Sequence, residues 1–362
     1  MVGFCKRYWS VIMPVIAAVV LAASWGRGMN TVSAIVVGVW LIGAVLAAVH
    51  HAETVAHRVG EPFGSLILAV AVTIIEVGLI VTLMISSGEK AASLARDTVF
   101  AAVMITCNGI FGLSLLVGAL KRRVAVFNAE GTGAALATVA TLATFTLVLP
   151  TFTTSEPGPV FSGSQLIFAA VASLVLYGVF VMVQTVRHPG DFLPVEGTVS
   201  ALDDEDEEPP TRRQALVSLG LLLVALIGVV GLAKVVSPNI ESGIAAAGLP
   251  QSAVGVVIAL LVLLPETIAA VRAARRDRVQ ISLNLALGSA MASIGLTIPA
   301  IALASIWING PLELGLGATQ MVLLALTVVV GALTVVPGRA TLLQGCVHLV
   351  LFSGFVFLAV SP

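Results

Sequence analysis

Two glutamates stand inside long apolar runs of the sequence, Glu76 in residues 63–88 and Glu266 in residues 248–273. Placing a charged side chain at the centre of a bilayer costs about 2.5 to 3.5 kcal/mol on insertion scales. Such a carboxylate must therefore hold a proton, pair with a cation or face a water-filled cavity. We interpret both residues as proton-binding and metal-ligating groups. The alternative for Glu76 is a protonated acid that only bridges helices through hydrogen bonds.

Oxygen atoms near each glutamate fit a cation site. Thr73 precedes Glu76 by one helical turn and shares its face. Pro265 lacks an amide hydrogen, so the carbonyl of Leu261 loses its helical partner beside Glu266. Carboxylate and carbonyl oxygens are the ligands that hard cations prefer.

A row of small residues follows in residues 279–306, at helical spacing: Ser282, Ala286, Ser289, Ser293 and Thr297. The row either lines an ion path or allows helices to pack closely. Two further acids, Glu61 and Asp97, lie near the predicted ends of spans, with Glu61 about 22 Å from Glu76 along a helix. They are candidates for cation entry or relay, although acids at helix ends are usually just solvated.

The composition places these residues in a membrane protein. Hydrophobic residues make up 58% of the 362-residue chain and charged residues 10%, which leaves too little polar surface to cover a soluble globule. The expected partner is a lipid bilayer and not nucleic acid. Runs of about 20 apolar residues without strand-like alternation indicate helices that cross a core roughly 30 Å thick. We predict an all-α polytopic fold of about eleven transmembrane helices, at residues 11–25, 32–50, 63–88, 95–120, 132–150, 164–187, 214–236, 248–273, 279–306, 319–336 and 339–360.

The loop charges predict the orientation. With a cytoplasmic N-terminus, only Arg27, Lys90, Arg96 and Lys234 of the 18 lysines and arginines fall on the outer side. Basic residues accumulate in cytoplasmic loops. The N-terminus is therefore expected inside and the C-terminus outside.

An acidic segment divides the chain. Residues 188–213 contain an unbroken acidic run at 203–208, interpreted either as a solvated connector or as a cytoplasmic sensor of divalent cations. We predict a leading helix in residues 1–30, five helices in 31–187 and five in 214–362. Because five is odd, the second set enters the membrane inverted, and Glu76 and Glu266 then lie in corresponding helices.

The cysteines and histidines indicate no further chemistry. Cys5, Cys107 and Cys346 are too far apart in sequence to suggest a disulfide framework or a metal cluster. His50, His51 and His57 cluster near the end of the second span, where packing or pH sensing would both explain them. No cofactor and no enzymatic motif is predicted, so the chain is interpreted as a secondary transporter.

Three stretches resemble one transporter family: HAETVAHRVGEPFGSLILAVAVTIIEVGLIVTLM at 51–84, ARDTVFAAVMITCNGIFGLSLLVGAL at 95–120 and LLPETIAAVRAARRDRVQISLNLALGSAMASIGLTIPA at 263–300. They are similar to bacterial ChaA-type calcium/sodium-proton antiporters, of the cation/proton exchanger branch of the calcium:cation antiporter superfamily. The resemblance covers nearly the whole chain. It implies a bacterial inner-membrane protein with one leading helix, two inverted five-helix repeats and an acidic segment between them.

The resemblance also implies one essential glutamate in each repeat, and Glu76 and Glu266 match those positions. The polar residues of the following helices match Asn108 in the first repeat and Asn284, Ser289 and Ser293 in the second.

The chain departs from the family where many members carry a Gly-Asn pair before each glutamate. It has Val72-Thr73 before Glu76 and Val262-Leu263 before Glu266. The missing amide oxygens make sodium or potassium as good a cargo as calcium. We predict export of Ca²⁺, Na⁺ or K⁺ in exchange for H⁺, with protons and cations competing at the two glutamates. The alternative is a passive cation channel lined by the same acids.

Overall fold

The computed structural model describes residues 2–60, 63–87, 92–195, 210–250, 252–307 and 310–361. Glu61 and the acidic run at 203–208 lie outside the described residues. The first half of the chain forms α1 (Val2–Ser24), α2 (Thr31–Val59), α3 (Phe63–Ser87), α4 (Leu94–Met104), η2 (Ile105–Ile110), α5 (Phe111–Arg122), β1 (Val124–Val126), α6 (Ala129–Ala143), η3 (Thr144–Val148), η4 (Leu149–Thr151), α7 (Gly163–Met182), η5 (Val183–Arg187) and η6 (Pro189–Phe192). The second half forms α8 (Arg212–Ala246), α9 (Ser252–Val262), α10 (Leu264–Arg275), α11 (Val279–Ala304), α12 (Ala318–Val335), β2 (Arg339–Thr341) and α13 (Leu342–Val360).

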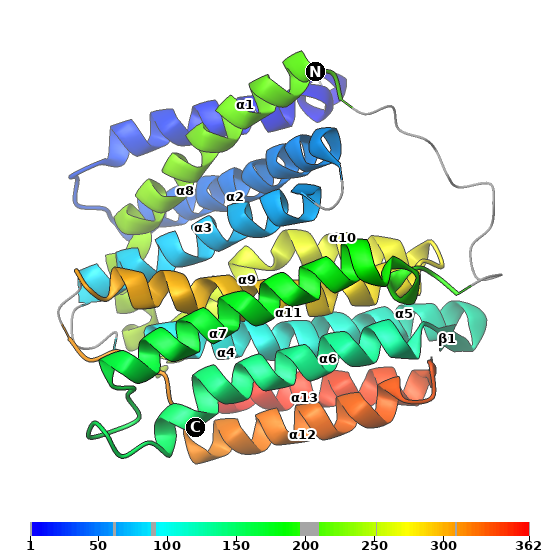
Figure 1. The fold of residues 1–362 in the computed structure, drawn as a ribbon. Helices are drawn as coiled ribbons and strands as arrows, with labels where there is room; N and C mark the ends of the chain where they lie inside the picture. Colours follow the sequence, from blue (N-terminus) through cyan, green and yellow to red (C-terminus); the bar gives the residue numbers. More distant parts are fainter. Residues whose placement is uncertain are drawn as a thin grey trace.

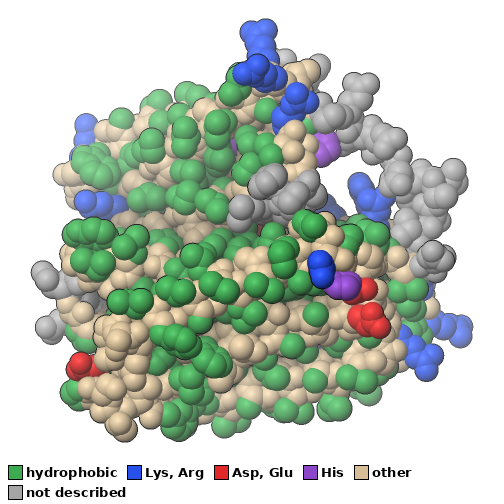
Figure 2. Space-filling view, in the orientation of Figure 1, with side chains coloured by type: hydrophobic (Ala, Val, Ile, Leu, Met, Phe, Trp, Pro, Cys, Tyr) green, Lys and Arg blue, Asp and Glu red, His purple; other side chains and the backbone are tan. Residues whose placement is uncertain are grey.

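The helices run roughly along one direction, and the two ends of the chain lie at opposite ends of the bundle (Figure 1). Within the described residues, nine helices are long and apolar enough to cross a membrane, and the bent pair α9–α10 forms a tenth span. The shorter apolar helix Trp9–Ser24 makes eleven, as the sequence predicts. The face drawn in Figure 2 is mostly hydrophobic, with charged side chains mainly toward its ends, which suits a lipid-facing surface.

Three boundaries differ from the predicted spans. Helix α2 continues to Val59 and α8 continues to Ala246, because an apolar stretch is only the part of a helix that lies in lipid, and polar turns extend it into the interface. The predicted span 248–273 is broken at Leu263 into α9 and α10, which are bent by 52°. Pro265 in the first turn of α10 explains the break, since it cannot donate a helical hydrogen bond.

The packing of the helices is symmetric under exchange of the two halves. Helix α2 packs against α8, the first helix of each half. The second helix of each half contacts the third helix of the other, in the pairs α3–α11 and α4–α9. The third and fifth helices pair in the same crossed way, in α11–α7 and α5–α13. This exchange is the pattern of an inverted repeat.

Short backbone pairings repeat the exchange at both ends of the bundle. Strands β1 and β2 pair antiparallel, with Ala125 opposite Ala340, and join the connection α5–α6 to the connection α12–α13. At the opposite end, Val160 forms a β-bridge with Glu313. This bridge joins the connection before α7 to the connection between α11 and α12. Each pairing closes backbone hydrogen bonds between segments far apart in sequence.

We call the end of the bundle that contains β1 and β2 the basic end, because its connections carry Lys121, Arg122, Arg187, Arg275 and Arg276. Lys121 Nζ and Arg122 Nη2 lie 2.7 and 3.3 Å from Asp277 Oδ2 in the turn between α10 and α11. Burial acts to raise the pKa of Asp277, but the hydrogen bonds and charges of these two residues outweigh it and lower this pKa below its usual value.

Helices α5 and α13 approach each other at two glycines. A Cβ added to Gly345 would lie 2.8 Å from the backbone nitrogen of Leu116 and 3.0 Å from the backbone oxygen of Gly112. Backbone atoms of two packed helices have no room to move aside. The close approach therefore depends on glycine at this position.

We predict that Gly345→Ala lowers the free energy of unfolding by about 1 to 3 kcal/mol, because overpacking forces the two helices apart. Thermal unfolding of the purified protein in detergent measures the effect. The matched control is Gly354→Ala in the same helix, where a Cβ would meet nothing within 4 Å. Equal unfolding temperatures for the two variants would show that this contact is not tight.

Candidate functional site

A cavity of about 220 Å³ lies between α3, α7, α9, α10 and α11 and contains both predicted glutamates. Its wall combines apolar side chains with a small group of polar residues: Thr73, Glu76, Tyr177, Gln184, Glu266, Asn284, Ser289 and Ser293. Apart from Ala102, the lining comes from the middle of each helix and from its half toward the basic end. Concave sites with few converging polar groups are typical of small-ligand binding.

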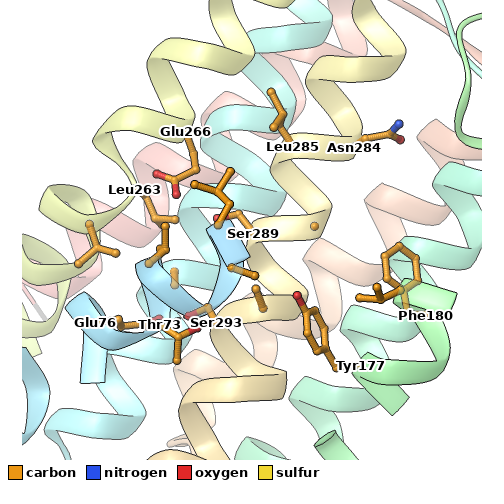
Figure 3. A pocket seen from close by; sticks show the side chains of 18 of the residues that line it. Thr73, Glu76, Tyr177, Phe180, Leu263, Glu266, Asn284, Leu285, Ser289 and Ser293 are labelled. Atoms are coloured by element: carbon orange, nitrogen blue, oxygen red, sulfur yellow. Dashed lines mark hydrogen bonds between the residues drawn. The ribbon is translucent and has the colours of Figure 1, made fainter. Parts of the chain in front are cut away.

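Glu76 is buried, with 3% of its surface exposed. Both of its carboxylate oxygens accept hydrogen bonds from α11, which belongs to the other half of the chain. Ser293 Oγ donates to Oε1 at 2.6 Å, and Thr297 Oγ1 donates to Oε2 at 2.9 Å. Figure 3 shows Glu76, Thr73 and Ser293 converging on one side of the cavity. The two hydroxyls fix the carboxylate and could also act as oxygen ligands for a cation.

Glu266 lies in the first turn of α10, directly after the break at Leu263. Its Oε2 atom is buried and has no hydrogen-bond partner. A buried carboxylate oxygen without a donor is costly unless it carries a proton or contacts a cation. The broken helix is what places this side chain in the cavity, and Figure 3 shows it across from Glu76.

The row of small residues on α11 has different surroundings at different depths. Ser289 lines the cavity, and Ser293 and Thr297 donate hydrogen bonds to Glu76. Ser282, nearer the basic end, lies within hydrogen-bond distance of Ser114 Oγ and of the carbonyl oxygen of Ala270 instead. The first group faces the cavity, and the second joins helices.

Two predicted binding residues are oriented elsewhere. Asn284 is part of the cavity wall, but its amide points away from both glutamates (Figure 3) and donates to the carbonyl of Phe192 at 2.6 Å. Asn108 lies outside the lining of the cavity. Its Nδ2 donates to Thr327 Oγ1 at 2.9 Å, and its Oδ1 lies 3.1 Å from Nδ1 of His348. The structure therefore does not bring Asn108 together with the glutamates.

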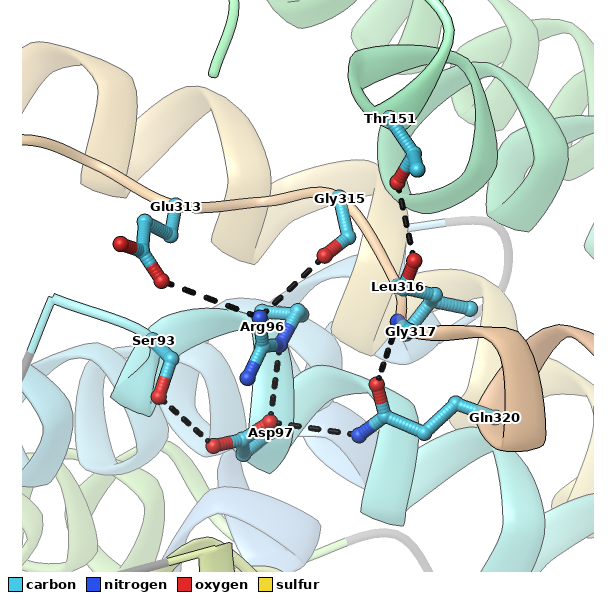
Figure 4. Close-up of polar contacts among 9 residues, drawn as sticks. All are labelled: Ser93, Arg96, Asp97, Thr151, Glu313, Gly315, Leu316, Gly317 and Gln320. Carbon is cyan, nitrogen blue, oxygen red and sulfur yellow. Dashed lines mark hydrogen bonds and ion pairs between the residues drawn. The ribbon is translucent and has the colours of Figure 1, made fainter. Parts of the chain in front are cut away.

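Asp97 lies at the end of the bundle opposite to the basic end, where it is fully engaged (Figure 4). Its Oδ1 pairs with Arg96 Nε at 2.9 Å, and its Oδ2 accepts from Ser93 Oγ at 2.9 Å. Arg96 also donates to the carbonyl of Gly315 at 3.2 Å, so the pair joins α4 to the connection before α12. Asp97 is thus a buried, bonded residue in this conformation and not a free acid at an entrance.

Sequence reasoning missed three residues of the site. Thr297 belongs to the predicted row but was not chosen as a binding residue, and its bond to Glu76 depends on the relative position of α3 and α11. Tyr177 in α7 and Gln184 in η5 line the cavity, and nothing in the spacing of that apolar run marks them.

The histidines and cysteines of the described residues lie apart from the cavity. Among the residues that the structure describes, no group of three histidine, cysteine or acidic side chains is arranged to hold a metal, and Cys107 and Cys346 are free thiols. His51 Nε2 lies 2.9 Å from the carbonyl of Ser10, and the ring of His50 contacts Trp9, so these histidines pack between α1 and α2.

In comparisons with known proteins, the chain matches one family model and is similar to transporter sequences and to a solved structure. The family model described as sodium/calcium exchanger protein matches residues 29–186 and 217–361. The chain is 46% identical to the putative ionic transporter y4hA of Sinorhizobium fredii, over 98% of this chain and 96% of that protein. It is 34% identical to the sodium-potassium/proton antiporter ChaA of Escherichia coli, over 96% and 94%. The crystal structure of the H⁺/Ca²⁺ exchanger CAX has a similar fold, with a TM-score of 0.70 and 17% identity over 98% of this chain and 93% of that chain.

We predict that Arg96→Met lowers the free energy of unfolding by about 3 to 5 kcal/mol, because it leaves the buried carboxylate of Asp97 without its counter-charge. In the double variant with Asp97→Asn, the cost should be clearly smaller than the sum of the two single costs. Thermal unfolding of all four proteins completes the cycle. Additive costs would show that the two side chains act independently.

Proposed function

The chain belongs to the sodium/calcium exchanger protein family, and from this premise we propose that it is a secondary active antiporter that exchanges a metal cation for protons across a membrane. The observation that carries the proposal is that Glu76 and Glu266, from opposite halves of the chain, line one cavity. The resemblance to ChaA-type antiporters that the sequence indicates agrees with the family match and with the relative from Escherichia coli.

Competition for the two carboxylates supplies the exchange. In a cavity with mostly apolar walls, two carboxylates cannot both stay charged and unpaired, because desolvation and mutual repulsion both disfavour that state. A proton or a metal cation neutralises them, and the arrival of one releases the other. The oxygen atoms of Ser293, Thr297 and Thr73 complete a set of hard ligands around the cation.

Alternating access follows from the crossed packing of the two halves. The lining of the cavity reaches from the glutamates toward the basic end and, apart from Ala102, does not extend toward Arg96 and Asp97 at the opposite end. Rocking of one half against the other would reverse this arrangement about the same site.

The ligand set favours no strict selectivity for calcium. Thr73 and Leu263 stand at the positions where the resemblance implies an amide side chain before each glutamate, and both line the cavity, one with a hydroxyl group and one with an apolar group. The neutral oxygens that contact Glu76 are the hydroxyls of Ser293 and Thr297. We propose Na⁺ or K⁺ as cargo alongside Ca²⁺; sodium and potassium are the cations for which the relative from Escherichia coli is named.

The basic end is proposed to face the cytoplasm of a bacterium, with the protein in the inner membrane. Connections rich in arginine remain on that side of a membrane. Protons then run inward down their gradient and the cation is exported.

A cation channel is the rival function. It would require a continuous path, whereas the described cavity extends toward one end only. A channel would pass cations without a proton gradient, and a conductance in planar bilayers would reveal it.

We predict that Glu76→Gln and Glu266→Gln each abolish cation-induced proton flux. The assay uses inverted vesicles that are acidified inside, in which added Na⁺, K⁺ or Ca²⁺ should dissipate the pH gradient of the parent protein. Glu130→Gln, at an exposed position in the first turn of α6, is the matched control and should exchange normally. Normal exchange by either of the two cavity variants would remove that residue from the site.

Direct competition predicts a defined pH dependence. Lowering the pH by one unit should raise the cation concentration for half-maximal flux by about tenfold for each proton that the cation displaces. The flux at saturating cation should change much less. A series of cation titrations at several pH values in proteoliposomes measures both quantities. A half-maximal concentration that is independent of pH would contradict competition at a shared site.

A further inference from the structure

The turn that follows α7 at the basic end contains one buried residue. Residues 186–191 and 193–195 are exposed or half-buried, whereas Phe192 at the end of η6 retains only 6% of its surface exposed. A single apolar side chain therefore attaches this turn to the body of the protein. By sequence, the turn is also where the chain leaves the first half for the acidic connector.

A chain of hydrogen bonds holds the backbone of this turn. Asn284 Nδ2 donates to the carbonyl of Phe192 at 2.6 Å, and Gln280 Nε2 donates to Asn284 Oδ1 at 2.8 Å. Gln280 Oε1 in turn accepts from the backbone nitrogen of Asn128, the N-cap of α6, at 2.6 Å. Gln280 is almost fully buried, so its orientation is fixed by these partners. The turn is thus linked through α11 to α6.

The side chain of Phe192 meets the wall of the ion cavity. Its ring lies edge-on to the ring of Phe180, with centroids 5.6 Å apart and an interplanar angle of 87°. Phe180 and Asn284 both line the cavity on its side toward the basic end. On the opposite side of the turn, a Cβ at Gly131 would come within 2.1 Å of the carbonyl oxygen of Asp191. The absence of a side chain at Gly131 therefore leaves space for the turn, which Asn284 and Phe180 contact from the other side.

We propose that the turn 188–193 is a lid over the end of the cation cavity nearest the basic end. In this proposal Phe192 is the closing side chain, and Asn284 and Gln280 are positioning residues that hold it. The inference rests on the proposed function in that the guarded cavity is the exchange site. It assigns Asn284 a role in access to the site, in place of the cation ligation that the sequence suggested.

The small number of attachments suits a lid. The hydrogen bond from Asn284, the aromatic contact with Phe180 and the packing of Asp191 against Gly131 hold the turn, while residues 186–190 lie at the surface. An apolar ring at the mouth excludes a hydrated cation when it is seated and admits it when it swings out. Few contacts need to break, so cation binding can shift the balance between the two positions.

The test measures access to the cavity from each side of the membrane. Ser289→Cys in the cavity wall serves as the reporter, in a background in which Cys5, Cys107 and Cys346 are replaced by alanine. A charged, membrane-impermeant thiol reagent is applied to inverted and to right-side-out vesicles. We expect Phe192→Ala and Asn284→Ala each to accelerate modification from the basic-end side by about fivefold or more. This is the factor that one lost aromatic contact supplies for Phe192→Ala and one lost hydrogen bond for Asn284→Ala.

Two further variants separate a lid from a general loosening of the fold. Phe192→Leu keeps an apolar side chain at the mouth and should restore most of the slow rate. Phe168→Ala removes an aromatic ring from an exposed position on α7 and should leave the rate unchanged. Equal rates for Phe192→Ala and the parent, no modification of either, or the same acceleration in both vesicle orientations would overturn the proposal.

The result is independent of transport. Thiol modification needs no cation flux, so a protein that fails the exchange assay can still show the side-specific change in access. Loss of exchange with an intact lid response would reject the antiporter function alone. Normal exchange with no lid response would reject the lid alone.

Discussion

The burial of two carboxylates among apolar helices is the constraint on which the rest of this structure depends. A charged carboxylate in this setting needs hydrogen-bond donors, a proton or a cation. For Glu76 the donors are Ser293 and Thr297, and they come from the opposite half of the chain. For Glu266 the break between α9 and α10 brings the side chain into the cavity, where one oxygen has no partner. Both halves must therefore be present and correctly packed before either carboxylate has its surroundings.

The two carboxylates are equivalent in topology but not in chemistry. Glu76 stands in a continuous helix and is fully hydrogen-bonded, whereas Glu266 follows a bend and is not. An inverted repeat imposes similar helix positions on both halves, but the side chains have diverged. The asymmetry that the sequence suggested, with Pro265 beside Glu266 alone, is present in the structure as a broken helix on one side only of the described site.

The sequence predicted the spans well because burial in lipid is recorded directly as apolar runs, and it predicted the glutamates because a charge within such a run is conspicuous. It did not predict which partners these residues contact. The bond between Thr297 and Glu76, the turn of Asn284 toward Phe192 and the distance of Asn108 from the cavity all depend on how helices are rotated against each other. Spacing along one helix defines a face, but not the neighbour of that face. Arg96 likewise forms an ion pair with Asp97. The sequence shows two separate charges at these positions and did not predict the pair.

The crossed packing has a consequence for the origin of such a chain. Each half contributes the third helix that covers the second helix of the other, and the paired connections at both ends, β1 with β2 and Val160 with Glu313, also join one half to the other. A polypeptide of half this length would leave those faces and strand edges bare. It would be complete only as a pair of copies inserted in opposite directions, so an ancestor of half this length would need both orientations in the same membrane. A single chain that holds both halves fixes the orientation of each and gives the two carboxylates different surroundings.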